Sequence, residues 1–165
     1  MMTDGVDHEF SLTYPNTRER YGTVITLSQA RTIVDNALQH AREQELPPMT
    51  VAVLDSAGSL VAFAREDRAS LLRERIARGK AHGALNMGIG SRALAARAEA
   101  HPQFINALVA LAEGNLVPVP GGVLVRDEVG DIIGAVGVSG HLPDADEACA
   151  VSGIEAAALQ AEPGE

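Results

Sequence analysis

Apolar and polar positions along the chain follow first the period of a helix and then that of a strand. From residue 27 to residue 44 the apolar side chains recur every three or four positions, which predicts an amphipathic helix capped by Thr26 or Ser28. The short apolar runs Met49–Leu54 and Leu60–Ala64 flank the turn sequence Asp55–Gly58. This spacing predicts a β-hairpin with two largely apolar strands.

The second half of the chain repeats the helical and the extended pattern. Helical periods cover residues 71–85, part of 87–100, 104–112 and 144–160. Extended apolar runs occupy Leu116–Val119, Val123–Arg126 and Ile132–Val138, and an acidic turn joins the last two. Strands joined by short turns pair antiparallel, so we predict an α+β domain in which helices cover an antiparallel sheet.

The composition indicates one domain with a core of small aliphatic side chains. Of the 165 residues 46% are hydrophobic, but only 3% are aromatic and Trp is absent, so Ala, Val, Leu and Ile must fill the core. A chain of this length can bury one substantial core. Because the first residues are polar, we expect an N-terminal arm over residues 1–24 and a single domain over residues 25–165.

Charge is distributed unevenly along the chain. The net charge is −9, which argues against nucleic acid as a partner. Residues 65–99 nevertheless hold eight Lys and Arg against four Asp and Glu, whereas residues 100–165 hold one against ten. The basic segment is either a solvated helix face or a surface that meets carboxylates of a ligand or of a second subunit. Together with the Ala- and Gly-rich stretch 83–100, this opposition predicts a homo-oligomer.

Several signals of other protein classes are missing from the sequence. The single cysteine, Cys149, excludes an internal disulfide framework and a cysteine-based zinc site, and we expect it to be a small buried residue. No apolar run is long enough to span a membrane, and the first residues lack the apolar segment of a secretory signal. We therefore expect a cytoplasmic protein without a membrane partner. The fingerprints of dinucleotide-binding loops, P-loops, zinc proteases and serine hydrolases are also missing.

Two glycine-rich segments predict a ligand site beside the sheet. Gly121 and Gly122 precede one predicted strand, and Ser139, Gly140 and His141 follow the next, just before the last helix. Glycine lets backbone N–H groups approach a ligand closely, and a helix N-terminus favours an anion. We expect these segments to donate hydrogen bonds to a ligand, with the imidazole of His141 as a further contact.

Basic side chains on a predicted strand end and a predicted helix complete this site. Arg65 and Arg68 follow the second strand of the hairpin and suit carboxylates, although a strand-end salt bridge explains them equally well. Arg78 and His82 are four residues apart and share a helix face. His82 is either a haem-iron ligand, a general base or an ordinary hydrogen-bonded histidine, and Lys80 is either an anion partner, a nucleophile or a solvated lysine. We expect one pocket where these groups and the glycine segments converge.

Four separate motifs resemble one known family. The sequences VAVLDSAGSLVAFAREDRA, ARGKAHGAL, PGGVLV and IIGAVGVSGHLPDADEACA occur in that order within residues 27–160. They resemble the GlcG/HbpS family, also called the haem-degrading or DUF336 domain, whose relatives include the C-terminal domain of PduO-type corrinoid adenosyltransferases. The resemblance implies a profilin-like fold with a five-stranded antiparallel sheet, frequent homo-oligomers and, among several activities, haem binding. His82 departs from the family pattern, in which Arg, Lys or a small residue is expected.

Two functions from different classes follow from these observations. The first is binding of haem, a related tetrapyrrole or another small ligand. For haem, arginines would neutralise the propionates and His82 would ligate the iron. Because the sequence lacks a CxxCH motif, any haem is held non-covalently. The second is a cofactor-independent acid–base enzyme, an isomerase, tautomerase or hydrolase, that acts on a small oxo-acid in a catabolic pathway. The sequence leaves catalysis itself open, and the candidate catalytic residues are His82, Arg65 and Lys80. A third reading is an oligomeric scaffold with a vestigial site.

Overall fold

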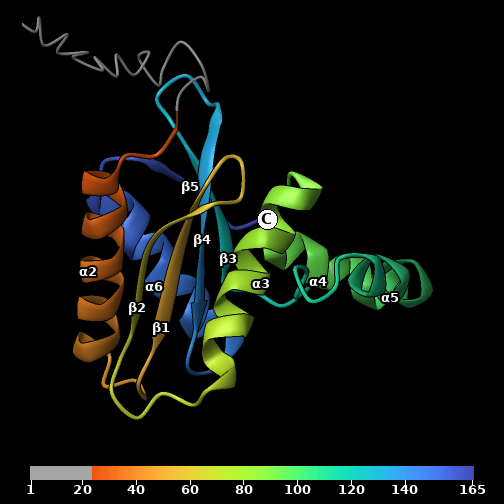
Figure 1. Cartoon of the computed structure of the whole chain (residues 1–165), viewed down its shortest axis with the longest axis horizontal. Coiled ribbons are helices and arrows are strands. Elements are labelled where there is room, and N and C mark those ends of the chain that lie inside the picture. Colours follow the sequence, from red (N-terminus) through yellow and green to blue (C-terminus); the bar gives the residue numbers. More distant parts are fainter. Residues whose placement is uncertain (1–23) are drawn as a thin grey trace, which may run out of the picture.

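A five-stranded antiparallel sheet with helices on both faces forms the body of the protein. The computed structural model describes residues 24–165. The strands lie in the order β2-β1-β4-β3-β5, with bounds β1 Thr50–Asp55, β2 Leu60–Arg65, β3 Gly122–Arg126, β4 Ile132–Ser139 and β5 Gln160–Glu162. Helices α2 (Leu27–Glu43) and α6 (Pro143–Ala156) cover one face and α3 (Leu72–Met87) covers the other, while α4 (Ser91–Ala100) and α5 (Pro102–Leu111) extend away from the sheet (Figure 1). The predicted α+β fold with five antiparallel strands is confirmed.

Both predicted hairpins form, and the turn of the first is fixed by a side chain. β1 pairs with β2 and β3 pairs with β4. Asp55 Oδ1 accepts hydrogen bonds from the backbone N–H groups of Ala57 and Ser59, at 3.0 and 2.8 Å. Gly58 in this turn has a φ of +83°, which glycine adopts without strain. Hydrogen bonds within the turn therefore stabilise its shape.

The larger core lies between the sheet and the helices α2 and α6. Side chains such as Val53 and Val136 project from the central strands into it, and α2 packs against α6 above them. α2 begins at a capping box, in which Thr26 and Gln29 each accept a backbone hydrogen bond from the other residue. Cys149 of α6 is buried in this core, as predicted.

On the opposite face, α3 rests on the backbone of the sheet. Gly137 on β4 and Gly122 on β3 are cross-strand neighbours beneath the helix. A Cβ atom on Gly137 would lie 1.8 Å from the carbonyl oxygen of Ala77, and a Cβ atom on Gly122 would lie 2.3 Å from that of Lys80. Because any side chain at these two positions collides with the helix backbone, glycine sets the height of α3 above the sheet.

The structure corrects one strand and one helix boundary. The run Leu116–Val119 is not a strand; it contains a proline, and its Val117 N–H donates to the carbonyl of Gly79, so the segment lies along α3 instead. The fifth strand is Gln160–Glu162, and the helix predicted over residues 144–160 overlaps it at Gln160. α6 ends at Ala156, and the chain then turns to pair with β3. The sequence after Ala156 favours a helix locally, but its pairing with β3, which is distant in the sequence, overrides that preference.

The predicted N-terminal arm lies outside the described residues, so the division into an arm and one domain stays a prediction. Within residues 24–165 no helix is both long enough and apolar enough to cross a membrane.

Candidate functional site

A row of polar residues crosses one end of the sheet on the face that α3 covers. Thr50 on β1 pairs with Arg65 on β2 and with Ser139 on β4. Directly paired residues of antiparallel strands project to the same face. Arg73, near the start of α3, reaches this row, and its Nη1 donates to Ser139 Oγ at 3.2 Å. The row, which we call the Thr50 row, therefore joins two arginines and two hydroxyls from four elements.

The Thr50 row contains polar groups that the protein itself does not satisfy. Thr50 and Ser139 are fully buried. Among the described residues, Thr50 Oγ1 is the one buried side-chain nitrogen or oxygen without a hydrogen-bond partner. Neither Arg65 nor Arg73 forms an ion pair with a carboxylate of residues 24–165.

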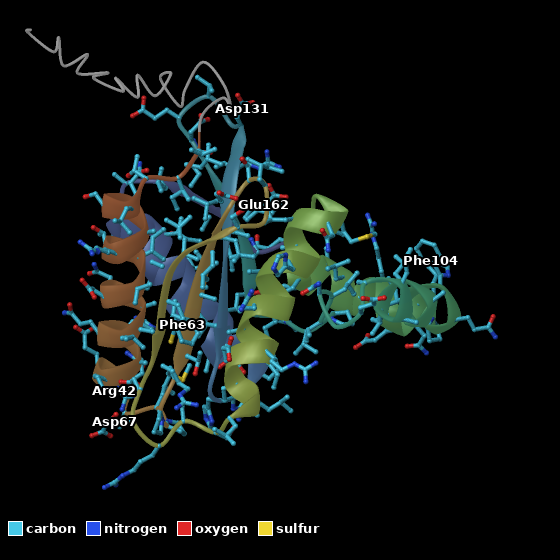
Figure 2. The ribbon with its side chains drawn as sticks, viewed as in Figure 1. Arg42, Phe63, Asp67, Phe104, Asp131 and Glu162 are labelled. Carbon is cyan, nitrogen blue, oxygen red and sulfur yellow. The ribbon has the colours of Figure 1, made fainter. Side chains whose placement is uncertain are left out.

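An apolar strip on the edge strand β2 adjoins the Thr50 row. Phe63 precedes Arg65 by two residues, so both side chains project to the face of α3, and Leu60 pairs with Leu54 of the core under that helix. α3 packs over β1, β3 and β4, which leaves these side chains of β2 accessible. Phe63, labelled in Figure 2, is 40% exposed. Leu60 is 45% exposed. Large apolar side chains exposed on a sheet edge are available to a ligand.

His82 of α3 lies near the end of β2 that is farther from the Thr50 row. Its imidazole packs against Gly58 in the turn between β1 and β2, with Cε1 3.3 Å from the point where a Cβ would stand. Burial lowers the pKa of His82 below the usual 6.5, and the charge of Arg78 one helical turn away lowers it further. The ring is therefore neutral at pH 7, and a neutral imidazole can bind a metal or accept a proton. Arg78 itself contacts Glu74 at 3.3 Å.

We call the exposed side chains of β2 and the α3 side chains beside them the β2–α3 face. It consists of Leu60, Phe63 and Arg65 from β2 and Arg78 and His82 from α3. Arg73 lies on the opposite side of α3 from His82, because nine residues turn a helix by about 180°, and it adjoins this face only through the Thr50 row.

Lys80 and Asp146 form a buried ion pair beneath α3, on the side of the helix that also carries Arg73, two turns away. Their side chains are 3% and 2% exposed, and Lys80 Nζ lies 2.8 Å from Asp146 Oδ2 and donates also to the carbonyl of Val138 at 3.0 Å. Burial lowers the pKa of Lys80 although Asp146 opposes this shift. With both contacts inside the protein, Lys80 acts as a link between α3, β4 and α6. Sequence reasoning missed its partner, which is 66 residues away.

Three backbone N–H groups of the glycine segments donate hydrogen bonds within the protein. Gly140 and His141 donate to Asp146 Oδ1 at 3.0 and 2.9 Å, and Gly122 donates to Ser91 Oγ at 2.7 Å. Gly121 has a φ of +114°, and a Cβ there would lie 2.8 Å from Lys80 Nζ. These segments therefore enclose the Lys80–Asp146 ion pair. The side chain of His141 is exposed and has no hydrogen-bond partner among the described residues.

The predicted site residues thus separate into two groups. Arg65, Arg78 and His82 are at least partly exposed on the α3 side of the sheet, whereas Lys80, Ser139 and the glycines of the two segments are buried. Arg68 is exposed in the connection from β2 to α3, with a φ of +69°. Thr50 and Arg73 were not predicted, because their roles depend on strand register and on the position of α3.

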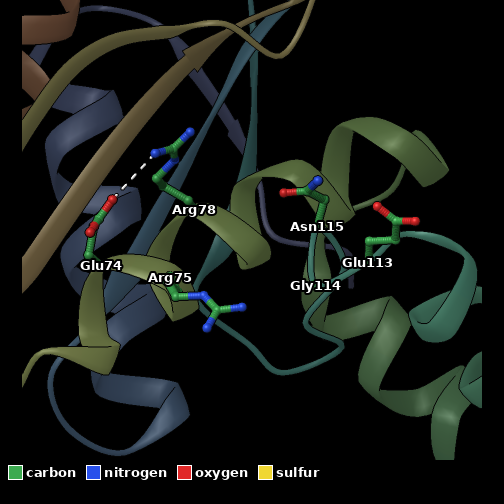
Figure 3. Close-up of a pocket in the computed structure, with 6 residues that line it drawn as sticks. All are labelled: Glu74, Arg75, Arg78, Glu113, Gly114 and Asn115. Atoms are coloured by element: carbon green, nitrogen blue, oxygen red, sulfur yellow. Dashed lines mark hydrogen bonds and ion pairs between the residues drawn. The ribbon is translucent and has the colours of Figure 1, made fainter.

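Two small cavities lie at the edges of these groups. One of about 200 Å³ is lined by residues of α3 and of the loop after α5: Glu74, Arg75, Arg78, Glu113, Gly114 and Asn115 (Figure 3). A more open one of about 430 Å³ lies at the end of β2 and includes Arg65 and Asp67. Within the described residues no group of three or more His, Cys, Asp and Glu side chains is arranged to hold a metal ion.

Comparison with known proteins identifies the family. Residues 25–155 match the family described as haem degrading protein HbpS-like, and the chain belongs to that family. No curated protein matches the chain at a significant level. Similar solved structures exist, and they share the fold.

Three of these structures illustrate the likeness. The crystal structure of a PduOC:heme complex has a TM-score of 0.76 at 22% identity, covering 84% of this chain and 98% of that one. The Klebsiella pneumoniae protein ORFY, of the DUF336 family, has a TM-score of 0.75 at 24% identity, with coverages of 82% and 92%. HbpS has a TM-score of 0.70 at 26% identity, with coverages of 79% and 88%.

Proposed function

We propose that this protein binds haem or a related tetrapyrrole non-covalently on the β2–α3 face. The observation that carries the proposal is the neutral, half-buried imidazole of His82 at one end of the β2–α3 face, which also carries the exposed Phe63 and, at its other end, Arg65. Membership of a family described as haem degrading supports it, as does the similar fold of a protein crystallised with haem.

The side chains of this face fit the chemistry of the ligand. Haem combines an apolar ring, two propionates and an iron atom that accepts an axial ligand. Phe63 and Leu60 offer apolar surface to the ring, and Arg65, with Arg73 of the adjoining Thr50 row, offers charged donors to the propionates. His82 can supply an axial nitrogen, because its pKa is lowered and its imidazole is neutral.

Each side chain then has a distinct role. His82 would hold the iron, and its contact with Gly58 in the β1–β2 turn fixes the ring against rigid backbone. Burial, and to a smaller extent the charge of Arg78 beside it, lowers the pKa of the imidazole, and Arg78 also offers a donor of its own. When bound, haem supplies iron redox chemistry, and the protein supplies ligation, orientation and charge neutralisation.

A haemin titration tests the proposal. We expect the wild-type protein to shift the Soret band of haemin, His82→Ala to change that shift or weaken binding, and Arg65→Ala to weaken binding by about 1.5–3 kcal/mol, the range for a hydrogen bond to a charged group. His40→Ala is the matched control, because His40 lies on α2, which covers the opposite face of the sheet. Binding that is identical in wild type, His82→Ala and Arg65→Ala would show that haem does not use this face.

A further inference from the structure

We propose that the Thr50 row is a binding site for a carboxylate, held by the guanidinium groups of Arg65 and Arg73 and by the hydroxyl of Thr50. The carboxylate is either a haem propionate or that of a free small organic acid. For the propionate the inference rests on the proposed function, whereas for a free acid it is independent of it.

The first observation is the unpartnered hydroxyl of Thr50. A buried polar group without a partner destabilises the folded protein, and such groups are rare. Thr50 Oγ1 is the only such side-chain atom among the described residues, and its neighbour in the row, Ser139, already has a partner in Arg73. A hydroxyl can donate to a carboxylate oxygen, which would satisfy this group.

The second observation concerns the hydrogen-bond and ion-pair partners of Arg73. In the described part of the chain, four arginines are half-buried, and three of them, Arg78, Arg92 and Arg126, contact carboxylates of the protein. Arg73 is the fourth, and its one hydrogen bond among these residues goes to the neutral oxygen of Ser139. A guanidinium has five N–H donors and pairs with carboxylates in a fork, so Arg73 keeps donors for an external anion.

The third observation is the register of the sheet, which brings a second cation to the same place. Arg65 is the direct cross-strand partner of Thr50, and it also lines the open cavity at the end of β2. An acid that approaches from this cavity meets Arg65, beside Arg42, Glu66 and Asp67 of the cavity wall. Because Thr50 and Ser139 are fully buried, the acid reaches the Thr50 hydroxyl only when neighbouring side chains rearrange. Side-chain rotations of this kind are fast compared with binding.

Two sets of probes separate the two sources of the carboxylate. The first set is haemin and haemin dimethyl ester, followed by their Soret bands; esterification removes the negative charge of the propionates, which accept the hydrogen bonds. The second set is sodium propionate, sodium pyruvate and inorganic phosphate, followed by calorimetry and by the rise in melting temperature on binding. The variants are Thr50→Val and Arg73→Gln. Their matched controls are Thr32→Val and Arg31→Gln, both on α2 and remote from the row.

We expect Thr50→Val and Arg73→Gln to weaken binding of at least one carboxylate probe about tenfold or more, while the two controls bind like wild type. Thr50→Val alone should keep or raise the melting temperature of the unliganded protein, since it removes an unsatisfied buried hydroxyl. A hydroxyl with a purely structural role would instead lower the melting temperature without affecting binding, and that result would overturn the inference.

The remaining outcomes are equally distinct. Failure of haemin to bind, combined with binding of propionate or pyruvate that depends on Thr50 and Arg73, would reject the proposed function and support this site. Equal binding of haemin and its dimethyl ester, without binding of either free acid, would support haem binding and overturn the carboxylate site. A preference for inorganic phosphate over both acids would overturn it as well.

Discussion

Neutralising Asp146 should destabilise the protein strongly, because it leaves a charged lysine in the interior. Asp146→Asn keeps the size of the side chain and an oxygen that can accept from the N–H groups of Gly140 and His141. It removes the charge that faces Lys80 Nζ at 2.8 Å. Removing one partner of a buried ion pair destabilises a protein by about 3–5 kcal/mol, a large part of the roughly 5–15 kcal/mol by which domains are stable.

Urea unfolding followed by circular dichroism measures this loss. With a slope of about 2 kcal/mol per molar urea, the expected change lowers the midpoint by roughly 1.5–2.5 M. The double variant Lys80→Met, Asp146→Asn should recover much of the loss, since it replaces the ion pair by a neutral pair that still accepts the two backbone hydrogen bonds. An Asp146→Asn protein within about 1 kcal/mol of wild type would refute the argument, as would a double variant no more stable than the single one.

The pH dependence gives an independent check. The pKa of Lys80 in the folded protein lies below its usual 10.5, because burial disfavours the charge. The unfolded chain therefore binds more protons than the folded one between the lowered pKa and 10.5, and stability rises with pH across that window. Asp146 raises the pKa of Lys80, so its loss lowers that pKa further and widens the window. The loss in Asp146→Asn should thus shrink as the pH rises from 7 towards 10, and a loss that grows with pH would contradict this mechanism.

Three further predictions concern the helix–sheet contact, His82 and assembly. Gly137→Ala should destabilise the fold by several kcal/mol because its Cβ meets the Ala77 carbonyl, whereas Gly83→Ala, whose contacts are 3.4 Å or longer, should be neutral or stabilising by up to about 1 kcal/mol in thermal unfolding. Equal effects of the two substitutions would refute the role of Gly137 in seating α3 on the sheet. Because the pKa of His82 lies below 6.5, wild type should lose more stability than His82→Gln as the pH falls below 6.5, and parallel pH profiles would contradict this. The α5 side chain Phe104 is 57% exposed, so light scattering should show an oligomer that Phe104→Glu weakens, and a 17.2 kDa species at micromolar concentration would contradict assembly (Figure 2).

Local patterns predicted those parts of the fold that depend on local interactions. The hairpin with Asp55 at its turn follows from neighbouring residues alone, and the helical spacing correctly places Arg78 and His82 one turn apart. The burial of Cys149 also followed from its apolar neighbours, and burial raises the pKa of its thiol to about 11. The strand Gln160–Glu162 was missed, because only its pairing with β3 makes it a strand.

The chemistry of the site depends on contacts between distant parts of the chain. Thr50 becomes notable only once the sheet register places it between Arg65 and Ser139, and no local signal indicates that its hydroxyl lacks a partner. The glycine segments were expected to donate to a ligand, but the carboxylate of Asp146 accepts from Gly140. A sequence pattern can predict that such backbone N–H groups are available. Which group accepts their hydrogen bonds depends on how the helices pack.

The contact of α3 with Gly122 and Gly137 has a consequence for altering the ligand preference of this protein. The spacing between helix and sheet is fixed where backbone meets backbone, and the side chains that project from the edge of α3 take no part in that contact. Substitutions at Arg78, His82 or Phe63 should therefore change the chemistry of the surface without moving the scaffold that carries it. This separation makes the β2–α3 face a suitable place to exchange metal-binding, charged and apolar side chains in an engineered binder.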